Sequence, residues 1–391
     1  MLRADPLKKY LDRHAEPEAR LPELEDLREH GPWTYALTIP ARRETIDCLA
    51  AAAAPAAQDQ VLTVLVVNAG PAQADRQLGA ALLESIEARA RARWQAPGLT
   101  LHRLPEFNQD ILLVDRCRPP RSFGERDGVG LARKLGADLI AQLIAQAAIR
   151  SPWIHTTDAD ARLPANHFQR VASLTPGAAI APFEHVKGSD PATDRATLQY
   201  EQTLRAYVKG LRQAGSPYAF HTIGSLISVA CSTYAQARGF PRRQAGEDFY
   251  MLNKLAKLAP IHQLQGAPVQ IKSRRSTRAP FGTGPAVEAL LAGAPLEVYD
   301  PKVFQILAQT LAALTIFAQT QDQTPFLRLL QTYPNIPELK TWHTTAQRLA
   351  TRYPIPQHLQ RFHEHFDAFR TLKLIHALTT HWPKIPWAPT R

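Results

Sequence analysis

Two aspartates separated by one alanine, Asp158 and Asp160, have the residue type and spacing in this sequence that most favour chemistry. They follow the apolar residues Trp153 and Ile154 and precede Pro164, so we expect them at the end of a buried strand. Aspartate is disfavoured in strands and is seldom buried without a partner. At the carboxyl end of a strand in an open α/β sheet, such side chains project into the crevice where ligands bind. The pair therefore predicts an Mg²⁺ or Mn²⁺ site with positions left open for phosphates, the alternative being a polar loop with a helix cap.

A second acidic pair, Glu247 and Asp248, begins a predicted helix shortly after the turn Gly239-Phe240-Pro241. A carboxylate that lies within hydrogen-bonding reach of a substrate hydroxyl can take its proton. The alternative is a charged first helical turn, which the helix dipole favours.

A basic segment at 271–284 is the third group, and its arginines are Arg274, Arg275 and Arg278. No acidic residue lies between Asp248 and Glu288, so this positive charge has no partner nearby in the sequence. Guanidinium groups make planar, bidentate contacts with phosphate oxygens, and Gly282 and Gly284 would let such a loop move. A phosphate-binding loop and a solvated surface turn both fit this pattern.

Composition limits the choice of partners and compartment. The chain has 391 residues and a net charge of +11, with a pI near 9.7, which indicates polyanionic partners or a solvated basic face. Three scattered cysteines without metal-ligand spacing indicate a reducing compartment. The segment 1–20 is charged throughout, so we expect no signal peptide and a cytoplasmic location. The most apolar helical stretch, 303–317, is interrupted by two glutamines, and we expect it to be too short to span a bilayer.

The elements that must position these groups alternate along the chain. Besides the strand before Asp158, apolar runs predict strands at 33–40, 61–67, 99–104, 178–182 and 218–231. Helices are predicted at about 44–57, 76–94 and 131–149. This alternation predicts an α/β protein with a doubly wound, mostly parallel sheet over 31–290. A helical lead-in is expected at 1–30 and a helical region at 291–391.

Six segments resemble, in the same order, those of the large family of inverting glycosyltransferases with a GT-A fold, the group that includes polysaccharide synthases. They are ALTIPARRE at 36–44, VLVVNAG at 64–70, GVGLARKLGADL at 128–139, DADARLP at 158–164, GSLISVACSTYAQARGF at 224–240 and GEDFYMLNKL at 246–255. The resemblance implies a GT-A domain that binds a nucleotide-diphosphate sugar, such as a UDP- or GDP-sugar, and transfers the sugar to an acceptor hydroxyl.

The same resemblance assigns roles to residues. Asp160 is the expected direct ligand of Mn²⁺ or Mg²⁺, with Asp158 on the ribose and the water shell of the metal. Asp248 is the expected general base, and Glu247 orients the acceptor or the loop. The expected nucleotide-binding residues are Pro40, Ala41, Arg42, Glu44, Asn68, Arg133, Asp158, Arg274, Arg275 and Arg278.

The sequence departs from the family pattern at Asn68, where many members carry an acid that helps to hold the base. The Gln-x-x-Arg-Trp signature and the membrane helices of processive synthases are missing, so we expect at most peripheral membrane contact.

A sugar nucleotidyltransferase is an alternative function. The glycine- and arginine-rich phosphate loop of that class is, however, replaced here by 40–44, which has no glycine. A catalytically inactive protein of this fold that binds nucleotide sugars or polyanions is another. Nucleic-acid binding is not expected, since the sequence has neither a known module nor interleaved surface aromatics.

Overall fold

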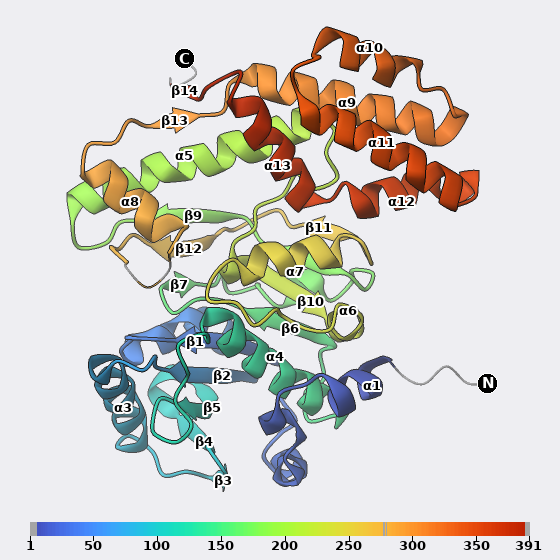
Figure 1. The fold of residues 1–391 in the computed structure, drawn as a ribbon. Coiled ribbons are helices and arrows are strands. Elements are labelled where there is room, and N and C mark those ends of the chain that lie inside the picture. The colour runs from blue at the N-terminus through green and yellow to red at the C-terminus, as the bar shows by residue number, and fades with distance from the viewer. Residues whose placement is uncertain (1–5, 277, 279, 388–391) are drawn as a thin grey trace. The chain divides into compact units, whose positions relative to one another are not determined.

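The apolar run at 61–68 forms β2 (Val61–Asn68), a strand whose residues are all buried. The computed structural model describes residues 6–276, 278 and 280–387, drawn as a ribbon in Figure 1. They pack as two compact units, Met1–Asp190 with Thr222–Gly282, and Pro191–His221 with Thr283–Arg391. The sequence predicts a domain boundary near residue 290 from a change in composition, whereas the two units are defined by packing. The predicted domain division therefore stays a prediction.

The first unit is built on a nine-stranded sheet in the order β11-β8-β10-β6-β1-β2-β5-β4-β3. In chain order the other strands are β1 (Tyr35–Ala41), β3 (Trp94–Ala96), β4 (Leu99–Leu104), β5 (Gln109–Arg116), β6 (Trp153–Thr156), β8 (Ala178–Ile180), β10 (Ile227–Ala230) and β11 (Ile261–Gln263). The ladders that join β6, β1, β2 and β5 are parallel. Within this sheet, β10 and β4 run against the direction of the other strands. The chain is therefore an α/β protein with a mixed, mostly parallel sheet.

Helices cover both faces of β2. Gly136 of α4 (Val129–Ala145) lies so close to the sheet that an added Cβ would be 3.2 Å from Val66 Cγ2. Gly79 of α3 (Gln73–Glu87) faces Val67 instead, and its Cβ would be 3.6 Å from Val67 Cγ1. Successive residues of a strand point to opposite faces, so α4 and α3 lie on opposite sides of the sheet. Helices therefore cover both faces of this part of the sheet.

A small sheet in the order β7-β12-β9 brings the basic segment next to the first acidic pair. Its strands are β7 (Ala161–Arg162), β9 (Phe183–Val186) and β12 (Val269–Lys272). The Lys272 amide donates to the Asp160 carbonyl at 2.9 Å, and the Ser273 amide donates to the Val186 carbonyl at 2.9 Å. Arg274 therefore follows directly after a strand that is fixed beside Asp160.

The N-terminal lead-in is tied to α4 through Asp138, whose side chain is fully buried. Tyr10 of α1 (Pro6–Arg13) and Tyr234 of α6 (Cys231–Gln236) each donate to Asp138 Oδ1 at 2.6 Å. Lys134 Nζ lies 2.5 Å from Asp138 Oδ2. The other helices of this unit are α2 (Ala53–Ala56), α7 (Glu247–Leu255) and the 3₁₀ helices Pro17–Arg20, Pro22–His30, Ile46–Ala52, Pro105–Phe107, Gln169–Val171 and Gly224–Leu226.

The second unit is helical. Its elements are α5 (Pro191–Gln213), α8 (Thr283–Leu291), α9 (Pro301–Thr320), α10 (Thr324–Thr332), α11 (Pro337–Arg352), the 3₁₀ helix Ile355–Gln357, α12 (His358–His365) and α13 (Ala368–Thr379), with a short ladder between β13 (Glu297–Val298) and β14 (Ile385–Pro386). Among the described residues, α9 is the helix long and apolar enough to cross a membrane, and it is longer than the sequence predicts. Val303, Ile306 and Leu307 of α9 are fully buried in the core of this unit, so length and composition are weak grounds for a membrane span.

Two predicted elements differ from the structure, and one strand was not predicted. A regular helix does not form at 44–57, where a 3₁₀ helix is followed by α2, because Pro55 fits only the first turn of a helix. The strand expected at 218–231 is confined to β10, since the backbone turns through a 3₁₀ helix at Gly224–Leu226. β5, which the sequence analysis passed over, is a central strand with the apolar run Ile111–Val114.

Candidate functional site

The site lies where the parallel strands β1, β2 and β6 end at one edge of the sheet. After β1 the chain continues to β2 on one side, and β6 later pairs with the other side of β1. A crevice forms outside the carboxyl ends of strands at such a switch in strand order, and ligands of open α/β sheets bind there. Asp158 follows β6, Arg42 follows β1, and Asn68 ends β2.

The Asp158 carboxylate is held by two partners. Its Oδ1 lies 2.6 Å from Arg133 Nη2, and its Oδ2 accepts a hydrogen bond from the Ser225 hydroxyl. Burial by itself would raise the pKa of Asp158, but the charge of Arg133 and these hydrogen bonds outweigh it and hold the pKa below its ordinary value. Asp158 is therefore a fixed anion, and both of its oxygens are engaged.

Arg133 connects the two acidic pairs, because it contacts both Asp158 and Glu247. Its side chain is 2% exposed, and Nε donates to Glu247 Oε1 at 3.0 Å while Nη2 binds Asp158. Its Nη1 faces the Gly224 carbonyl at 3.3 Å, and a Cβ on Gly224 would be only 2.3 Å from Nη2. The family resemblance implies that Arg133 binds the nucleotide; in the structure its guanidinium is buried and contacts the carboxylates of Asp158 and Glu247.

Asp248 is the second residue of α7 and follows Glu247. Burial, together with the charge of Glu247, raises the pKa of Asp248 to about 7, although Arg133 opposes the shift. Its Oδ1 accepts a hydrogen bond from the Phe249 amide at 2.7 Å. A carboxylate with a pKa near 7 is suited to accept a proton at neutral pH.

Asp160 pairs with the basic segment. Arg274 Nε lies 2.5 Å from Asp160 Oδ2, and Arg274 Nη1 donates to Glu44 Oε2 at 3.0 Å. Arg278 Nη1 also contacts Glu44 and donates to the Arg42 carbonyl at 2.8 Å. Burial raises the pKa of Asp160, and the negative charge of Asp158 adds to this rise, while Arg274 opposes it.

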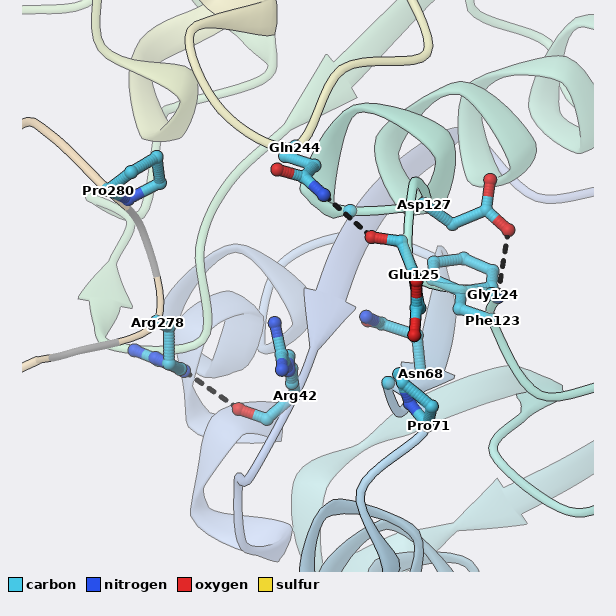
Figure 2. Close-up of a pocket in the computed structure, with 12 residues that line it drawn as sticks. Arg42, Asn68, Pro71, Phe123, Gly124, Glu125, Asp127, Gln244, Arg278 and Pro280 are labelled. Carbon is cyan, nitrogen blue, oxygen red and sulfur yellow. Dashed lines mark hydrogen bonds between the residues drawn. The ribbon is translucent and has the colours of Figure 1, made fainter.

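A cavity of about 200 Å³ opens beside these groups. Its lining residues, most of which are labelled in Figure 2, are Arg42, Asn68, Gly70, Pro71, Phe123, Gly124, Glu125, Asp127, Gly128, Gln244, Arg278 and Pro280. The Arg42 guanidinium is fixed by Asp75, whose Oδ2 lies 2.5 Å from Nη2. Asn68 is 3% exposed, and its Oδ1 has no hydrogen-bond partner among the described residues.

The structure divides the predicted nucleotide-binding residues into those that line the cavity and those that do not. Arg42, Asn68 and Arg278 line it. Pro40 and Ala41 end β1, with Ala41 buried in the sheet. Glu44 lies outside the cavity as the partner of two arginines, and Arg275 is exposed and is not part of the lining.

Several residues of the site are not predicted from the sequence. The loop at 115–130 is basic and glycine-rich but lacks the spacing of known phosphate loops. Its residues Phe123, Gly124, Glu125, Asp127 and Gly128 line the cavity. Asp75 and Ser225, which hold Arg42 and Asp158, carry no sequence signal, because each gains its role from a partner distant in the chain.

The site has the donor atoms for a hard cation but not a complete ligand set. Among the described residues, no cluster of three or more histidine, cysteine, aspartate or glutamate side chains is arranged to hold a metal ion. Mg²⁺ is commonly held by one or two carboxylates, with water and substrate phosphates completing its shell. Asp160 fits that role through its carboxylate oxygens, provided that Arg274 gives up its place there.

Comparisons with known proteins add little to this geometry. No protein-family model matches the chain, and no curated protein matches it. The chain is weakly similar to the crystal structure of M. tuberculosis glucosyl-3-phosphoglycerate synthase, with 13% identity, a TM-score of 0.33, and coverage of 73% of this chain and 83% of that chain. A second structure, described only as a mycobacterial protein, shows 13% identity, a TM-score of 0.34 and coverage of 71% and 82%. Function therefore has to be inferred from the site itself.

Proposed function

We propose that this protein is an inverting, metal-dependent glycosyltransferase that moves a sugar from a nucleotide-diphosphate sugar to an acceptor hydroxyl. The observation that carries the proposal is the linkage of two acidic pairs, Asp158 with Asp160 and Glu247 with Asp248, at the carboxyl edge of a parallel sheet. Arg133 connects the two pairs through Asp158 and Glu247. We further propose that the reaction takes place in the cytoplasm, with at most peripheral membrane contact.

The donor would bind in the cavity with its base near Asn68 and Phe123 and its diphosphate between Arg42 and Arg278. Both arginines line the cavity, and guanidinium groups make charge-assisted hydrogen bonds with phosphate oxygens. Asp160, with Asp158 behind it, would hold the divalent cation. When bound, this cation supplies a Lewis acid that neutralises the charge developing on the leaving diphosphate.

Asp248 would act as the general base. The acceptor hydroxyl gives its proton to Asp248, its oxygen forms the new bond to the anomeric carbon, and the bond to the diphosphate breaks with the electron pair leaving on the phosphate oxygen. The raised pKa of Asp248 supports this role, because the carboxylate is both available and sufficiently basic near pH 7. Glu247 stays bound to Arg133 and so fixes the first turn of α7.

A catalytically inactive nucleotide-sugar-binding protein is the second candidate, and one observation favours it. Arg133 and Arg274 already neutralise the two aspartates that would otherwise face a metal. Such a protein would bind donor without the need for a cation.

The two candidates are separated by calorimetry with UDP and GDP, first with Mn²⁺ and then with EDTA, followed by a search for released nucleotide diphosphate from a panel of nucleotide sugars and acceptors. Cation-dependent binding and release of UDP or GDP are expected for the transferase. Binding that chelation leaves unchanged, with no turnover of any donor, would identify the inactive binding protein. Failure to bind any nucleotide would refute both.

A further inference from the structure

Arg274 pairs with the carboxylate of Asp160, the group that would hold the proposed cation. The side chain is 30% exposed and that of Asp160 is 18% exposed, so the pair lies at the rim of the site rather than in its interior. Arg274 also contacts Glu44, at 2.9 Å from Oε1 and 3.0 Å from Oε2.

The two contacts of Arg274 differ in kind. Its Nη1 makes a hydrogen bond with Glu44. Its Nε is 2.5 Å from Asp160 Oδ2, but the N–H has no aligned acceptor, so this contact is an ion pair without a directed hydrogen bond. The contact with Asp160 is the one that a cation bound to this carboxylate would replace.

The backbone permits such an exchange. Ser273 is the last residue fixed by the small sheet, because its backbone N–H donates a hydrogen bond to the Val186 carbonyl. The Lys272 amide keeps Asp160 in place independently of the Arg274 side chain. Arg274 can therefore leave the carboxylate by side-chain rotation while Asp160 stays in position.

Charge balance shows when the exchange is favourable. Two carboxylates, Asp160 and Glu44, face two guanidinium groups, Arg274 and Arg278, so this part of the site is neutral without ligand. A divalent cation alone would place positive charge beside Arg274, and a diphosphate alone would place negative charge beside Asp160. Bound together, the charges of the cation and the diphosphate largely offset each other.

We propose that Arg274 is an exchangeable counter-ion that couples the two ligands of this site. It occupies Asp160 in the free protein, and it moves to a diphosphate oxygen when a divalent cation takes its place. The inference rests on the proposed binding of a metal and a nucleotide diphosphate. It implies that each ligand raises the affinity for the other by the same factor, since coupling between binding sites is reciprocal.

Calorimetry on the full chain tests the exchange, with Mn²⁺ alone, UDP, GDP or inorganic pyrophosphate alone, and Mn²⁺ together with each anion. For the wild type we expect weak binding of Mn²⁺ alone and a gain of about tenfold or more when an anion is present, as the strength of a charge-assisted hydrogen bond implies. Arg274→Ala should bind Mn²⁺ alone about tenfold more tightly than the wild type, bind the anion more weakly, and lose the coupling.

Matched variants separate this exchange from a general charge effect. Lys272→Ala removes one exposed positive charge close by in the chain and should keep the wild-type affinities. Asp160→Asn should lose the tighter Mn²⁺ binding when it is combined with Arg274→Ala. If Arg274→Ala does not fold, as judged by its thermal transition, Arg274→Gln carries the same test with a side chain that still fills the space.

The outcomes are distinct. If the wild type binds Mn²⁺ and anion together but Arg274→Ala and Arg274→Gln bind Mn²⁺ alone no more tightly, the exchange is overturned while the proposed function stands. If Lys272→Ala gains as much Mn²⁺ affinity as Arg274→Ala, the effect is general charge and the exchange is again overturned. If no anion binds the wild type with or without Mn²⁺, the proposed function fails and the exchange fails with it.

Discussion

At the scale of single residues, the site combines carboxylates whose pKa is raised, Asp248 and Asp160, with one whose pKa is lowered, Asp158. The pKa of Asp248 is raised to about 7 by burial and by Glu247, while Arg133 holds the pKa of Asp158 below its ordinary value. Opposite shifts in neighbouring carboxylates are typical of sites in which one group accepts a proton and another binds a cation or ligand.

Asp248→Asn should lower turnover by about 10² to 10⁴, because the amide keeps the shape of the side chain but accepts no proton. Donor binding should persist, since the residue faces the acceptor in the proposed arrangement. In the unmodified protein, the rate should rise with pH around a midpoint near 7, as Asp248 loses its proton. Turnover of Asp248→Asn close to that of the unmodified protein, or a pH profile without a limb near 7, would rule out this role.

Arg133→Gln should lower the free energy of unfolding by about 3 to 5 kcal/mol, because it leaves the buried Glu247 and the half-buried Asp158 without their common partner. Chemical denaturation measures this loss. Arg118→Gln is the matched control, since Arg118 is 35% exposed and pairs with Glu87 at the surface, where such a pair contributes about 1 kcal/mol or less. Equal losses in the two variants would contradict the positioning role of Arg133.

At the scale of elements, the distance between α4 and the sheet sets the place of the site. Gly136 lets α4 approach β1 so closely that a Cβ there would lie 1.9 Å from Thr38 Oγ1. Arg133 is on the same helix, three residues earlier, so the approach of α4 to the strands also places the guanidinium beneath Asp158 and Glu247.

Gly136→Ala should lower the free energy of unfolding by about 1 to 3 kcal/mol, because the added methyl meets a β-branched side chain in a packed sheet. Differential scanning calorimetry should show a lower transition midpoint. Gly124→Ala offers a control, since its Cβ would meet Asp127 Oδ2 at an ordinary 3.7 Å. If Gly136→Ala were as stable as Gly124→Ala, the close approach would not constrain the fold.

At the scale of the whole molecule, two histidines buried in the first unit make stability depend on pH. The rings of His155 and His167 lie 5.7 Å apart and pack against Phe168. His155 Nε2 and both ring nitrogens of His167 have no hydrogen-bond partner among the described residues. Burial holds the pKa of His155 well below its ordinary value and lowers that of His167 to about 3.

Because these pKa values are depressed in the folded state, the unfolded chain binds more protons below pH 6.5, and the stability present at neutral pH is lost as the pH falls from about 6.5 toward 3. Each histidine should contribute a slope of about 1.4 kcal/mol per pH unit in that range. His167→Leu should flatten the dependence of unfolding free energy on pH, whereas His381→Leu, at an exposed position, should not. Parallel pH dependences for His167→Leu and the unmodified chain would exclude this explanation.

The sequence by itself determined the class of the fold and the location of the two acidic pairs. The run at 61–68 predicts a strand covered on both faces, because a continuous apolar segment is typical of a strand buried on both sides. β2 is indeed buried throughout. Asp158 and Asp160 stand out because aspartate conflicts with the strand before it, and such a conflict can be read without the fold.

Only the tertiary structure decided which charges meet. Arg133 and Glu247 are 114 residues apart in the chain, and Arg274 and Glu44 are 230 apart, so no local pattern predicts either pair. The family resemblance implies that Arg133 binds the nucleotide, whereas the packing of α4 against the sheet buries its guanidinium against the carboxylates of Asp158 and Glu247. The basic segment has no acidic neighbour in the sequence, yet folding brings Asp160 and Glu44 to its arginines, since ion pairing depends on distance in space and not along the chain.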